Sequence, residues 1–253
     1  MVRSVRVVKR LLDVAGSLLG LAITAPFFPL IAAAVYLDSP GAIFIRQRRA
    51  GQLTRAGDDP AGPGGEGEGE DPPRPKFREF SMLKFRSMRP DAEELTGPVL
   101  ASEDDPRVTR VGRFLRRTRL DEVPQFINVF LGEMSIVGPR PERPELAEQL
   151  AHAIPYFEER MRDVKPGITG LAQVTLGYSG KPLPGSELDL FERDLTNPFK
   201  VDGAEDALAD HMRMKLLYDL AYTAAMEDLR SFVQLEVSIL LRTPLVMLRG
   251  GGT

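Results

Sequence analysis

Cysteine and tryptophan are absent from this 253-residue chain, and His152 and His211 are its only histidines. The lack of cysteine excludes a disulfide scaffold, a thiolate zinc site and a cysteine nucleophile. Two histidines without a partner motif argue against a multi-histidine metal centre and a catalytic triad, and we interpret both as structural. A Walker loop, a dinucleotide-binding fingerprint and a His-Glu-x-x-His motif are missing as well. Carboxylate chemistry, phosphate chemistry and the membrane remain to be considered.

An excess of one charge is also lacking. Lys and Arg number 33 and Asp and Glu 36, and the resulting net charge of −3 argues against a protein devoted to nucleic-acid binding. Hydrophobic residues make up 43% and charged residues 27%, which excludes a wholly disordered chain and a multi-span transporter. The length suits one sizeable core, so we predict that residues 1–253 form a single domain.

The longest stretch without a charged side chain covers residues 14–37. A straight helix of this length rises about 36 Å, enough for a hydrocarbon core of about 30 Å. However, Pro26 and Pro29 interrupt the run, and basic residues, which prefer the cytoplasm, flank both of its ends. We therefore predict that residues 8–38 form a re-entrant membrane helix that bends near Pro26 and returns. A single span and a buried soluble helix stay open as alternatives, whereas no signal-peptide cleavage pattern follows.

The rest of the chain is predicted to be an α/β fold that is mostly α. Residues 54–75 are rich in Gly, Pro and acidic side chains, and we expect a disordered surface insertion there. The insertion separates two strand-like pieces, 42–47 and 76–85, which we interpret as one hairpin because a longer loop adds little closure entropy. We expect loops, turns or irregular segments at 132–145, 164–174 and 177–205, and helices at 91–95, 107–119, 122–131, 145–160, 206–228 and 229–248.

Asp121 and Glu122 directly follow an arginine-rich helix and form the central acidic pair of the sequence. In such cationic surroundings we expect both carboxyl groups to have depressed pKa values and to stay ionised. An ionised Asp can bind Mg²⁺ together with phosphate oxygens, or attack phosphorus as a nucleophile. The alternative is that the pair only balances the preceding arginines at a helix start.

Two arginines differ in how the chain presents them. Arg116 belongs to the arginine run over 107–119, which suits a phosphate clamp, a solvated face or a face lying on anionic lipid. Arg140 stands between two prolines in a stiff loop, which favours a specific contact; an ion pair with Glu142 or Glu145 is the alternative.

Other basic side chains have equally balanced interpretations. Lys84 and Arg86 alternate along a strand and would share one face, as phosphate ligands or at an exposed sheet edge. Lys165 stands at the entrance of a Pro-Gly turn and either contacts phosphate or serves the turn alone. Lys9 and Arg10 lie at the mouth of the apolar run, where they either bind a lipid phosphate or act as snorkelling anchors.

Taken together, several segments resemble the bacterial sugar transferase family. These proteins are monotopic phosphoglycosyl transferases of the undecaprenyl-phosphate sugar phosphotransferase type, and they begin exopolysaccharide, capsule, O-antigen and glycoprotein glycan assembly. The resemblance rests on the proline-broken apolar run together with KRLLD at 9–13, FIRQRRAG at 44–51, KFRSM at 84–88, the segment 109–145, VKPGITGLAQV at 164–174 and KLLYDLAY at 215–222.

This resemblance implies a reaction in which a sugar 1-phosphate moves from a UDP-sugar to undecaprenyl phosphate and UMP is released. It implies Asp121 as the nucleophile that forms a covalent phosphosugar-aspartate, and Glu122 as an aid to the second half-reaction. Mg²⁺ is expected at the same carboxylate region, including Asp121. Arg116 and Arg140 match family arginines that are expected near phosphate.

The family also implies a location in the bacterial cytoplasmic (inner) membrane, with the catalytic part on the cytoplasmic face, membrane lipid as a partner and amphipathic helices at the interface. A homodimer is left open. The family's Ser-Pro bend reads Ala25-Pro26 here, so Thr24 is expected to cap the broken helix instead. The stretch TLGYSG at 175–180 replaces the usual Asn-Gly-Arg. A non-catalytic adaptor on anionic lipid, and a prenyl-phosphate enzyme whose carboxylates only bind metal, are the competing hypotheses.

Overall fold

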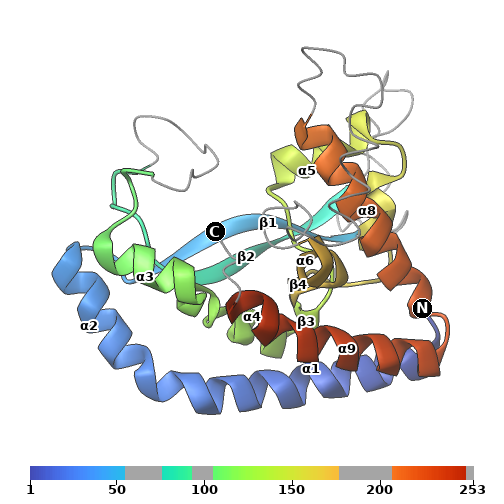
Figure 1. The fold of residues 1–253 in the computed structure, drawn as a ribbon, viewed down its shortest axis with the longest axis horizontal. Coiled ribbons are helices and arrows are strands. Elements are labelled where there is room, and N and C mark those ends of the chain that lie inside the picture. The colour runs from blue at the N-terminus through green and yellow to red at the C-terminus, as the bar shows by residue number, and fades with distance from the viewer. Residues whose placement is uncertain (55–75, 93–104, 177–206, 249–253) are drawn as a thin grey trace, which may run out of the picture.

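The computed structural model describes residues 1–54, 76–92, 105–176 and 207–248, and it shows a mostly helical protein with two small sheets (Figure 1). The predicted insertion from residue 55 onward, the predicted irregular segment 177–205 and most of the predicted helix 91–95 lie outside the described residues. The helices are α1 (Arg3–Thr24), α2 (Phe28–Asp38), α3 (Arg110–Thr118), α4 (Gln125–Leu131), α5 (Pro144–Ala153), α6 (Leu171–Leu176), α8 (Ala207–Ala225) and α9 (Leu229–Leu248), and the 3₁₀ turns are η1 (Ala25–Phe27), η2 (Leu120–Glu122) and η3 (Phe157–Met161).

The predicted hairpin is present, and its first strand extends six residues beyond the predicted end at residue 47. Strands β1 (Phe44–Leu53) and β2 (Phe77–Phe85) pair antiparallel, with Phe44 opposite Phe85. A second sheet was not predicted, because its strands β3 (Ser135–Val137) and β4 (Gly167–Thr169) are only three residues long and pair in parallel across a distant connection. The prediction of a loop over 132–145 therefore missed β3.

The prediction of one helix over 145–160 is wrong. Helix α5 ends at Ala153, because Pro155 lacks the backbone N–H that a continuing helix needs. Tyr156 then adopts a left-handed φ of 64°, and the 3₁₀ turn η3 follows. The turn at 164–174 contains the expected extended piece as β4, but it continues into the unpredicted helix α6.

The N-terminal helix bends where its prolines predicted. Helix α1 ends at Thr24, η1 contains Pro26, and α2 leaves at an open angle rather than folding back onto α1 (Figure 1). The expectation that Thr24 caps α2 is wrong, because its hydroxyl donates to the Gly20 carbonyl of α1 at 2.7 Å. By length and composition, Arg3–Asp38 is the one helix in the described part of the chain that could cross a membrane.

Helix α1 is also a wall of the folded domain. Two glycines allow its close approach: a methyl group on Gly20 would lie only 2.7 Å from the Phe126 ring of α4, and Gly16 faces Ile136 of β3 in the same way. Near its start, the Arg10 guanidinium donates to the carbonyls of Val129 and Phe130, both at 2.8 Å. Arg10 therefore caps the C-terminal end of α4, where carbonyls lack partners and cations are favoured.

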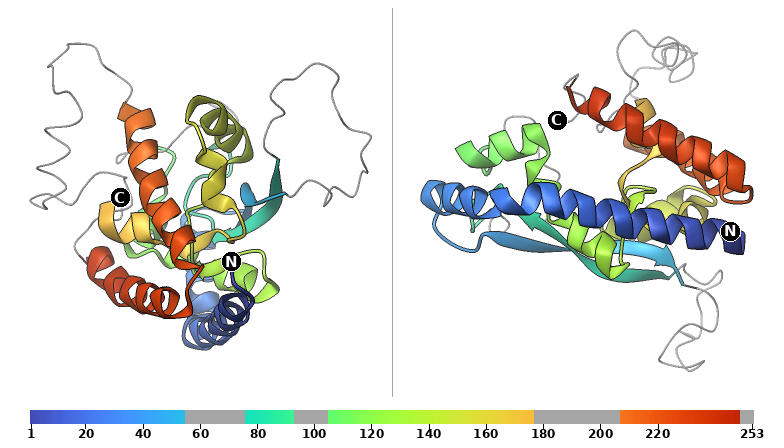
Figure 2. Two further views of the ribbon diagram at one scale, coloured as in Figure 1. Left: turned by 90° about the vertical axis from the view of Figure 1, so that its right-hand side faces the viewer. Right: turned by 90° about the horizontal axis from the view of Figure 1, so that it is seen from below.

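A buried set of polar side chains, the anchor network, ties α1 to the rest of the domain. The Lys9 ammonium pairs with Glu236 of α9 at 2.7 Å, and the Tyr222 hydroxyl of α8 donates to the same carboxylate at 2.7 Å. The Asp13 carboxylate accepts from the Ser135 hydroxyl at 2.8 Å and from the next backbone N–H at 2.9 Å. Helix α9 consequently runs beside α1 (Figure 2), and apolar side chains from both helices, β3 and α8 surround the network.

Candidate active site

Asp121 and Glu122 lie in η2, at the junction of α3 and α4. Thr109 caps the N-terminus of α3, because its side-chain oxygen accepts from the Gly112 N–H at 2.9 Å. Arg119, directly after the last residue of α3, has a left-handed φ of 59°. This reversal turns the acidic pair toward β2, and both carboxylate residues are buried, at 6% and 5% exposure.

The Glu122 carboxylate forms ion pairs with three basic side chains of the site. Its Oε1 atom lies 2.7 Å from Lys84 Nζ, 3.2 Å from Arg140 Nη2 and 3.8 Å from Arg119 Nη1. Burial by itself raises the pKa of Glu122, but Lys84, Arg140 and Arg119 together outweigh burial and hold that pKa well below its usual range. Glu122 therefore stays ionised and fixes the positions of three basic groups.

The Asp121 carboxylate is left without such partners. Its buried Oδ1 atom has no hydrogen-bond partner among the described residues. Burial raises the pKa of Asp121 to about 6, the neighbouring Glu122 charge adds to this, and Lys84, Arg119 and Arg116 oppose it. At neutral pH the group is mostly ionised, but its negative charge is poorly compensated.

The prediction that both carboxyl groups have depressed pKa values is therefore half wrong. It holds for Glu122 and fails for Asp121. The physical reason is that the sequence shows how many basic residues are nearby but not where their side chains point. The ion pairs of Lys84, Arg140 and Arg119 are all with Glu122. A buried, unpartnered carboxylate beside a paired one is typical of a site that awaits a ligand.

The loop that carries Arg140 is held from two sides. The Pro139 carbonyl accepts from the Gly167 N–H of β4 at 2.9 Å. The Arg140 carbonyl accepts from Arg160 at 3.0 Å, and Arg160 forms a buried ion pair with Asp219 of α8 at 2.7 Å. The stiff presentation expected for Arg140 is observed, and the described ion pair of its guanidinium is with Glu122.

Two basic residues near this group were missed at the sequence level. Arg49 of β1 has a buried Nε atom that meets no hydrogen-bond partner within the described ranges, and burial and the nearby Arg140 charge lower its pKa to about 10. Lys215 of α8 is half-buried, its desolvation lowers its pKa, and it lies near Glu142 and Arg160. Both residues lie in segments quoted above for the family resemblance, Arg49 in FIRQRRAG and Lys215 in KLLYDLAY, but no local pattern marked either as a site residue.

The site contains little that would hold a metal without a substrate. No group of three or more Asp, Glu or His side chains comes together anywhere in the described ranges. The free Oδ1 of Asp121 nevertheless fits Mg²⁺, which commonly keeps several waters and takes one or two carboxylates plus substrate phosphates. Glu122 is already engaged with basic groups, so Asp121 is the residue that would hold Mg²⁺.

The other predicted site residues lie elsewhere. Arg86 donates to the carbonyls of Ser39 and Pro40 just after α2 and is only 5% exposed, so it closes a helix end. Of the basic residues named from the sequence, the structure brings Lys84, Arg116 and Arg140 to the acidic pair.

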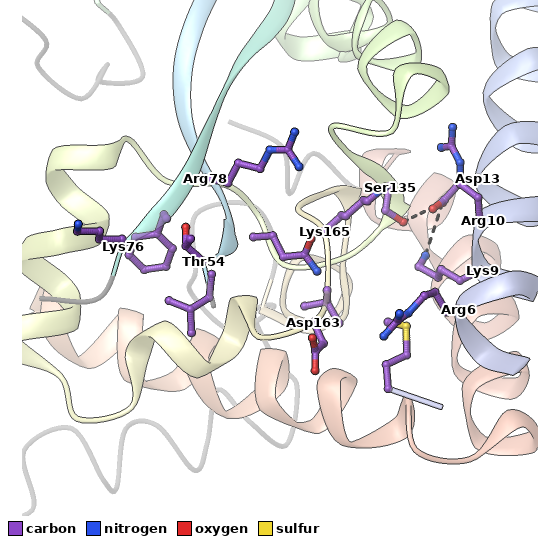
Figure 3. Close-up of a pocket in the computed structure, with 15 residues that line it drawn as sticks. Arg6, Lys9, Arg10, Asp13, Thr54, Lys76, Arg78, Ser135, Asp163 and Lys165 are labelled. Carbon is purple, nitrogen blue, oxygen red and sulfur yellow. Dashed lines mark hydrogen bonds and ion pairs between the residues drawn. The ribbon is translucent and has the colours of Figure 1, made fainter. Parts of the chain in front are cut away.

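Lys9, Arg10 and Lys165 meet at a separate cavity of about 1120 Å³, beyond the opposite end of α4 (Figure 3). A methyl group on Gly132, directly after α4, would lie 3.3 Å from Lys165 Nζ and 3.5 Å from the Arg10 guanidinium. Lys9 is already paired with Glu236, and Arg10 already donates to the end of α4. The prediction that these two residues bind a lipid phosphate stays a prediction, and other basic residues of the cavity would have to take part.

Comparison with known proteins identifies one protein family over most of the chain. The family model described as bacterial sugar transferase matches residues 4–56 and 73–250. The putative undecaprenyl-phosphate N-acetylgalactosaminyl 1-phosphate transferase of Bacillus subtilis is 40% identical over 154 residues, 61% of this chain and 73% of that protein. The exopolysaccharide production protein PSS of Rhizobium leguminosarum is 37% identical over 174 residues, 66% of this chain and 74% of that protein.

A third relative is considerably longer than this chain. The UDP-glucose:undecaprenyl-phosphate glucose-1-phosphate transferase of Escherichia coli is 40% identical over 176 residues, which are 70% of this chain but 32% of that protein. The chain thus spans about three quarters of the Bacillus and Rhizobium proteins and about a third of the Escherichia coli protein.

Proposed function

Since this chain belongs to the bacterial sugar transferase family, we propose that it moves a sugar 1-phosphate from a UDP-sugar to undecaprenyl phosphate and releases UMP. This would be the first membrane step in building an exopolysaccharide, O-antigen or related glycan. The observation that carries the proposal is the buried Asp121 carboxylate. Its Oδ1 atom has no hydrogen-bond partner in the described residues, although the adjacent Glu122 carboxylate is paired with Lys84.

In the first half-reaction, an Asp121 oxygen attacks the sugar-bearing β-phosphorus of the UDP-sugar. A bond from this oxygen to phosphorus forms, the bond to the bridging oxygen breaks, and UMP leaves with the α-phosphate. The poorly compensated charge of Asp121 makes its carboxylate a better nucleophile than that of Glu122, whose charge is stabilised by Lys84 and Arg140.

In the second half-reaction, an oxygen of undecaprenyl phosphate attacks the same phosphorus. The acyl phosphate bond breaks, the Asp121 carboxylate is restored, and the sugar leaves as a lipid diphosphate. Because each half-reaction needs the site empty of the other phosphate, the kinetics are expected to be ping-pong.

The basic groups of the site share the charge of the diphosphate. Lys84 and Arg140, held by Glu122, face the acidic pair, and Arg116 acts on Asp121 from α3. We assign Glu122 mainly to the positioning of these cations, because its strongly lowered pKa makes it a weak proton acceptor. Mg²⁺ bound at Asp121 would neutralise further diphosphate charge.

Exposed apolar side chains support a location at the membrane. Most side chains of the uncharged run in α1 and α2 are not buried in the domain. Helix α9, which lies beside α1 (Figure 2), carries further exposed apolar side chains. The bent α1–α2 unit would enter the cytoplasmic leaflet and return, with α9 lying in the interface. The exposed large apolar residues are Val7, Leu11, Leu12, Leu18, Leu19, Ile23, Phe27, Leu30, Tyr36 and Leu37 in α1, η1 and α2, and Leu229, Val233, Val237, Leu240, Leu241 and Leu245 in α9.

The decisive experiment is to incubate the protein with a labelled UDP-sugar and no lipid acceptor. We expect a covalent phosphosugar on Asp121 that mass spectrometry of the quenched protein locates, together with one equivalent of UMP. UDP-glucose, UDP-galactose and UDP-N-acetylgalactosamine, supplied separately, would identify the sugar.

Addition of undecaprenyl phosphate should then discharge the label, and Asp121→Ala should show none. An adaptor that binds anionic lipid through the exposed arginines of α3 would release no UMP, and an enzyme that uses its carboxylates only for metal would turn over without an adduct. Either result defeats the proposal.

A further inference from the structure

The cavity beyond the end of α4 gathers basic residues that are far apart in the sequence. Arg6 comes from α1, Arg78 from β2 at the hairpin end, and Lys165 from the turn before β4. Figure 3 shows Lys165 between the hairpin residues and the α1 residues. Neither Asp121 nor Glu122 lines this space. In all, six basic residues line the cavity against two acidic ones: Arg6, Lys9, Arg10, Lys76, Arg78 and Lys165 against Asp13 and Asp163.

Some of these charges are already used by the fold. Lys9 pairs with Glu236, Arg10 caps α4, and Asp13 accepts from β3. For the side chains of Arg6, Arg78 and Lys165, by contrast, the structure records no hydrogen bond or ion pair within the described ranges. Burial lowers the pKa of Lys165, and the charges of Arg10, Arg78 and Lys9 lower it further while Asp13 opposes them. The cavity therefore holds more positive charge than its own acids balance.

The position of the cavity along α1 indicates the source of a balancing anion. Arg10 precedes the uncharged run by four residues and Arg6 by eight, which corresponds to about 6 and 12 Å of helix. The polar headgroup layer extends roughly 5–8 Å beyond the hydrocarbon on each side of a bilayer. The cavity therefore lies at the end of α1 directly before the uncharged run, which puts it next to the headgroup layer when that run enters the hydrocarbon. Leu11 and Leu12, at the same end of α1, are exposed.

We infer that this cavity, built from Arg6, Arg78 and Lys165, is a binding site for the phosphate of an anionic membrane phospholipid. The inference rests on the membrane position given under the proposed function, but not on the chemistry of Asp121. The seven residues of α4, a rise of about 10 Å, separate the cavity from the acidic pair. A phosphate held there does not reach the reacting phosphorus, so the bound lipid is a resident one rather than the sugar acceptor.

The test uses the full-length protein in neutral detergent, titrated with dioctanoyl phosphatidylglycerol, dioctanoyl phosphatidylcholine or inorganic phosphate. We expect tight binding of phosphatidylglycerol only. Each basic side chain near an anionic lipid surface contributes about fivefold, so R78Q/K165Q should weaken this binding roughly 25-fold. The matched control R89Q/R162Q removes two exposed positive charges outside the cavity and should change the affinity by less than about twofold. Circular dichroism and thermal unfolding verify that both variants are folded.

Three results would overturn the inference. One is an equal loss in R78Q/K165Q and in the control, and another is equal affinity for inorganic phosphate, which would make the site one for soluble anions. The third is binding that appears only after Glu66, Glu68 and Glu70 are changed to Gln, since the acidic segment starting at the cavity rim would then be the occupant. Asp121→Ala should retain phosphatidylglycerol binding while it loses the phosphosugar adduct, so the lipid site and the proposed reaction can fail independently.

Discussion

Two buried groups of acidic and basic side chains in the described part of the chain, the anchor network and the acidic pair, have their acids paired to different degrees. In the anchor network, Asp13 accepts two hydrogen bonds and Glu236 is met by Lys9 and Tyr222. In the acidic pair, Glu122 is similarly matched, but Asp121 Oδ1 meets no partner in the described residues. Buried polar atoms that are satisfied stabilise a fold, whereas an unsatisfied one costs stability and is retained where a ligand or a reaction uses it.

The largest expected effect is a loss of activity when the acidic pair, rather than the anchor network, is changed. Asp121→Asn keeps the shape of the side chain but removes the nucleophile, so UMP release should fall by at least about 10⁴-fold. Initial rates of UMP release with saturating UDP-sugar and undecaprenyl phosphate measure this. Asp91→Asn, which changes an exposed acid that pairs with Arg89, is the control and should remain within about twofold of the wild type. Turnover by Asp121→Asn within tenfold of the wild type would contradict the assignment.

Breaking the anchor network should instead reduce stability. Glu236→Ala leaves the Lys9 ammonium buried without its closest counter-charge, which is expected to cost about 3–5 kcal/mol of unfolding free energy. Denaturant unfolding in detergent measures the loss. Glu227→Ala, at an exposed position in the turn before α9, should change stability by less than about 0.5 kcal/mol. Similar values for the two variants would mean that the network is not structural.

The same Asp121→Asn variant should be more stable than the wild type at neutral pH. The folded state raises the pKa of Asp121 from 3.8 to about 6, so the ionised carboxylate destabilises the fold above that pH. Removal of the charge is worth on the order of 2–3 kcal/mol above pH 7, and the difference should shrink as pH falls through about 6 and vanish below about 4. Unfolding curves across this range test the sign; a destabilised variant at pH 8 would show that the wild-type charge is well compensated.

A smaller effect concerns the pH dependence of the first half-reaction. In the proposed reaction only the ionised form of Asp121 can attack phosphorus, so kcat/KM for adduct formation should fall about tenfold per pH unit below about 6 and level off above it. Glu122 has a pKa far below this range and should add no second step. A midpoint near 4, the ordinary value of an aspartate, would mean that burial does not control the nucleophile.

Features set by short stretches of sequence were predictable. Two prolines within three residues of each other were enough to locate the bend, and alternating apolar pieces were enough to locate the β1–β2 hairpin. The acidic pair was identified because its residues are adjacent and follow an arginine run.

What could not be predicted depends on contacts between distant residues. The approach of Asp13 to Ser135, of Arg160 to Asp219 and of Lys84 to Glu122 spans 122, 59 and 38 positions, and no local pattern encodes these pairs. The pKa of Asp121 was mispredicted for the same reason, since it depends on which way the surrounding basic groups point.

The capping of α4 by Arg10 has a practical consequence. Helix α1 supplies the last turn of α4 with its hydrogen-bond donors, and α4 begins three residues after the acidic pair. Trimming the N-terminus to obtain a water-soluble version would remove these donors and is expected to loosen α4 beneath the acidic pair. Polar replacement of the outward-facing leucines of α1 is the route that keeps this support and still releases the protein from detergent.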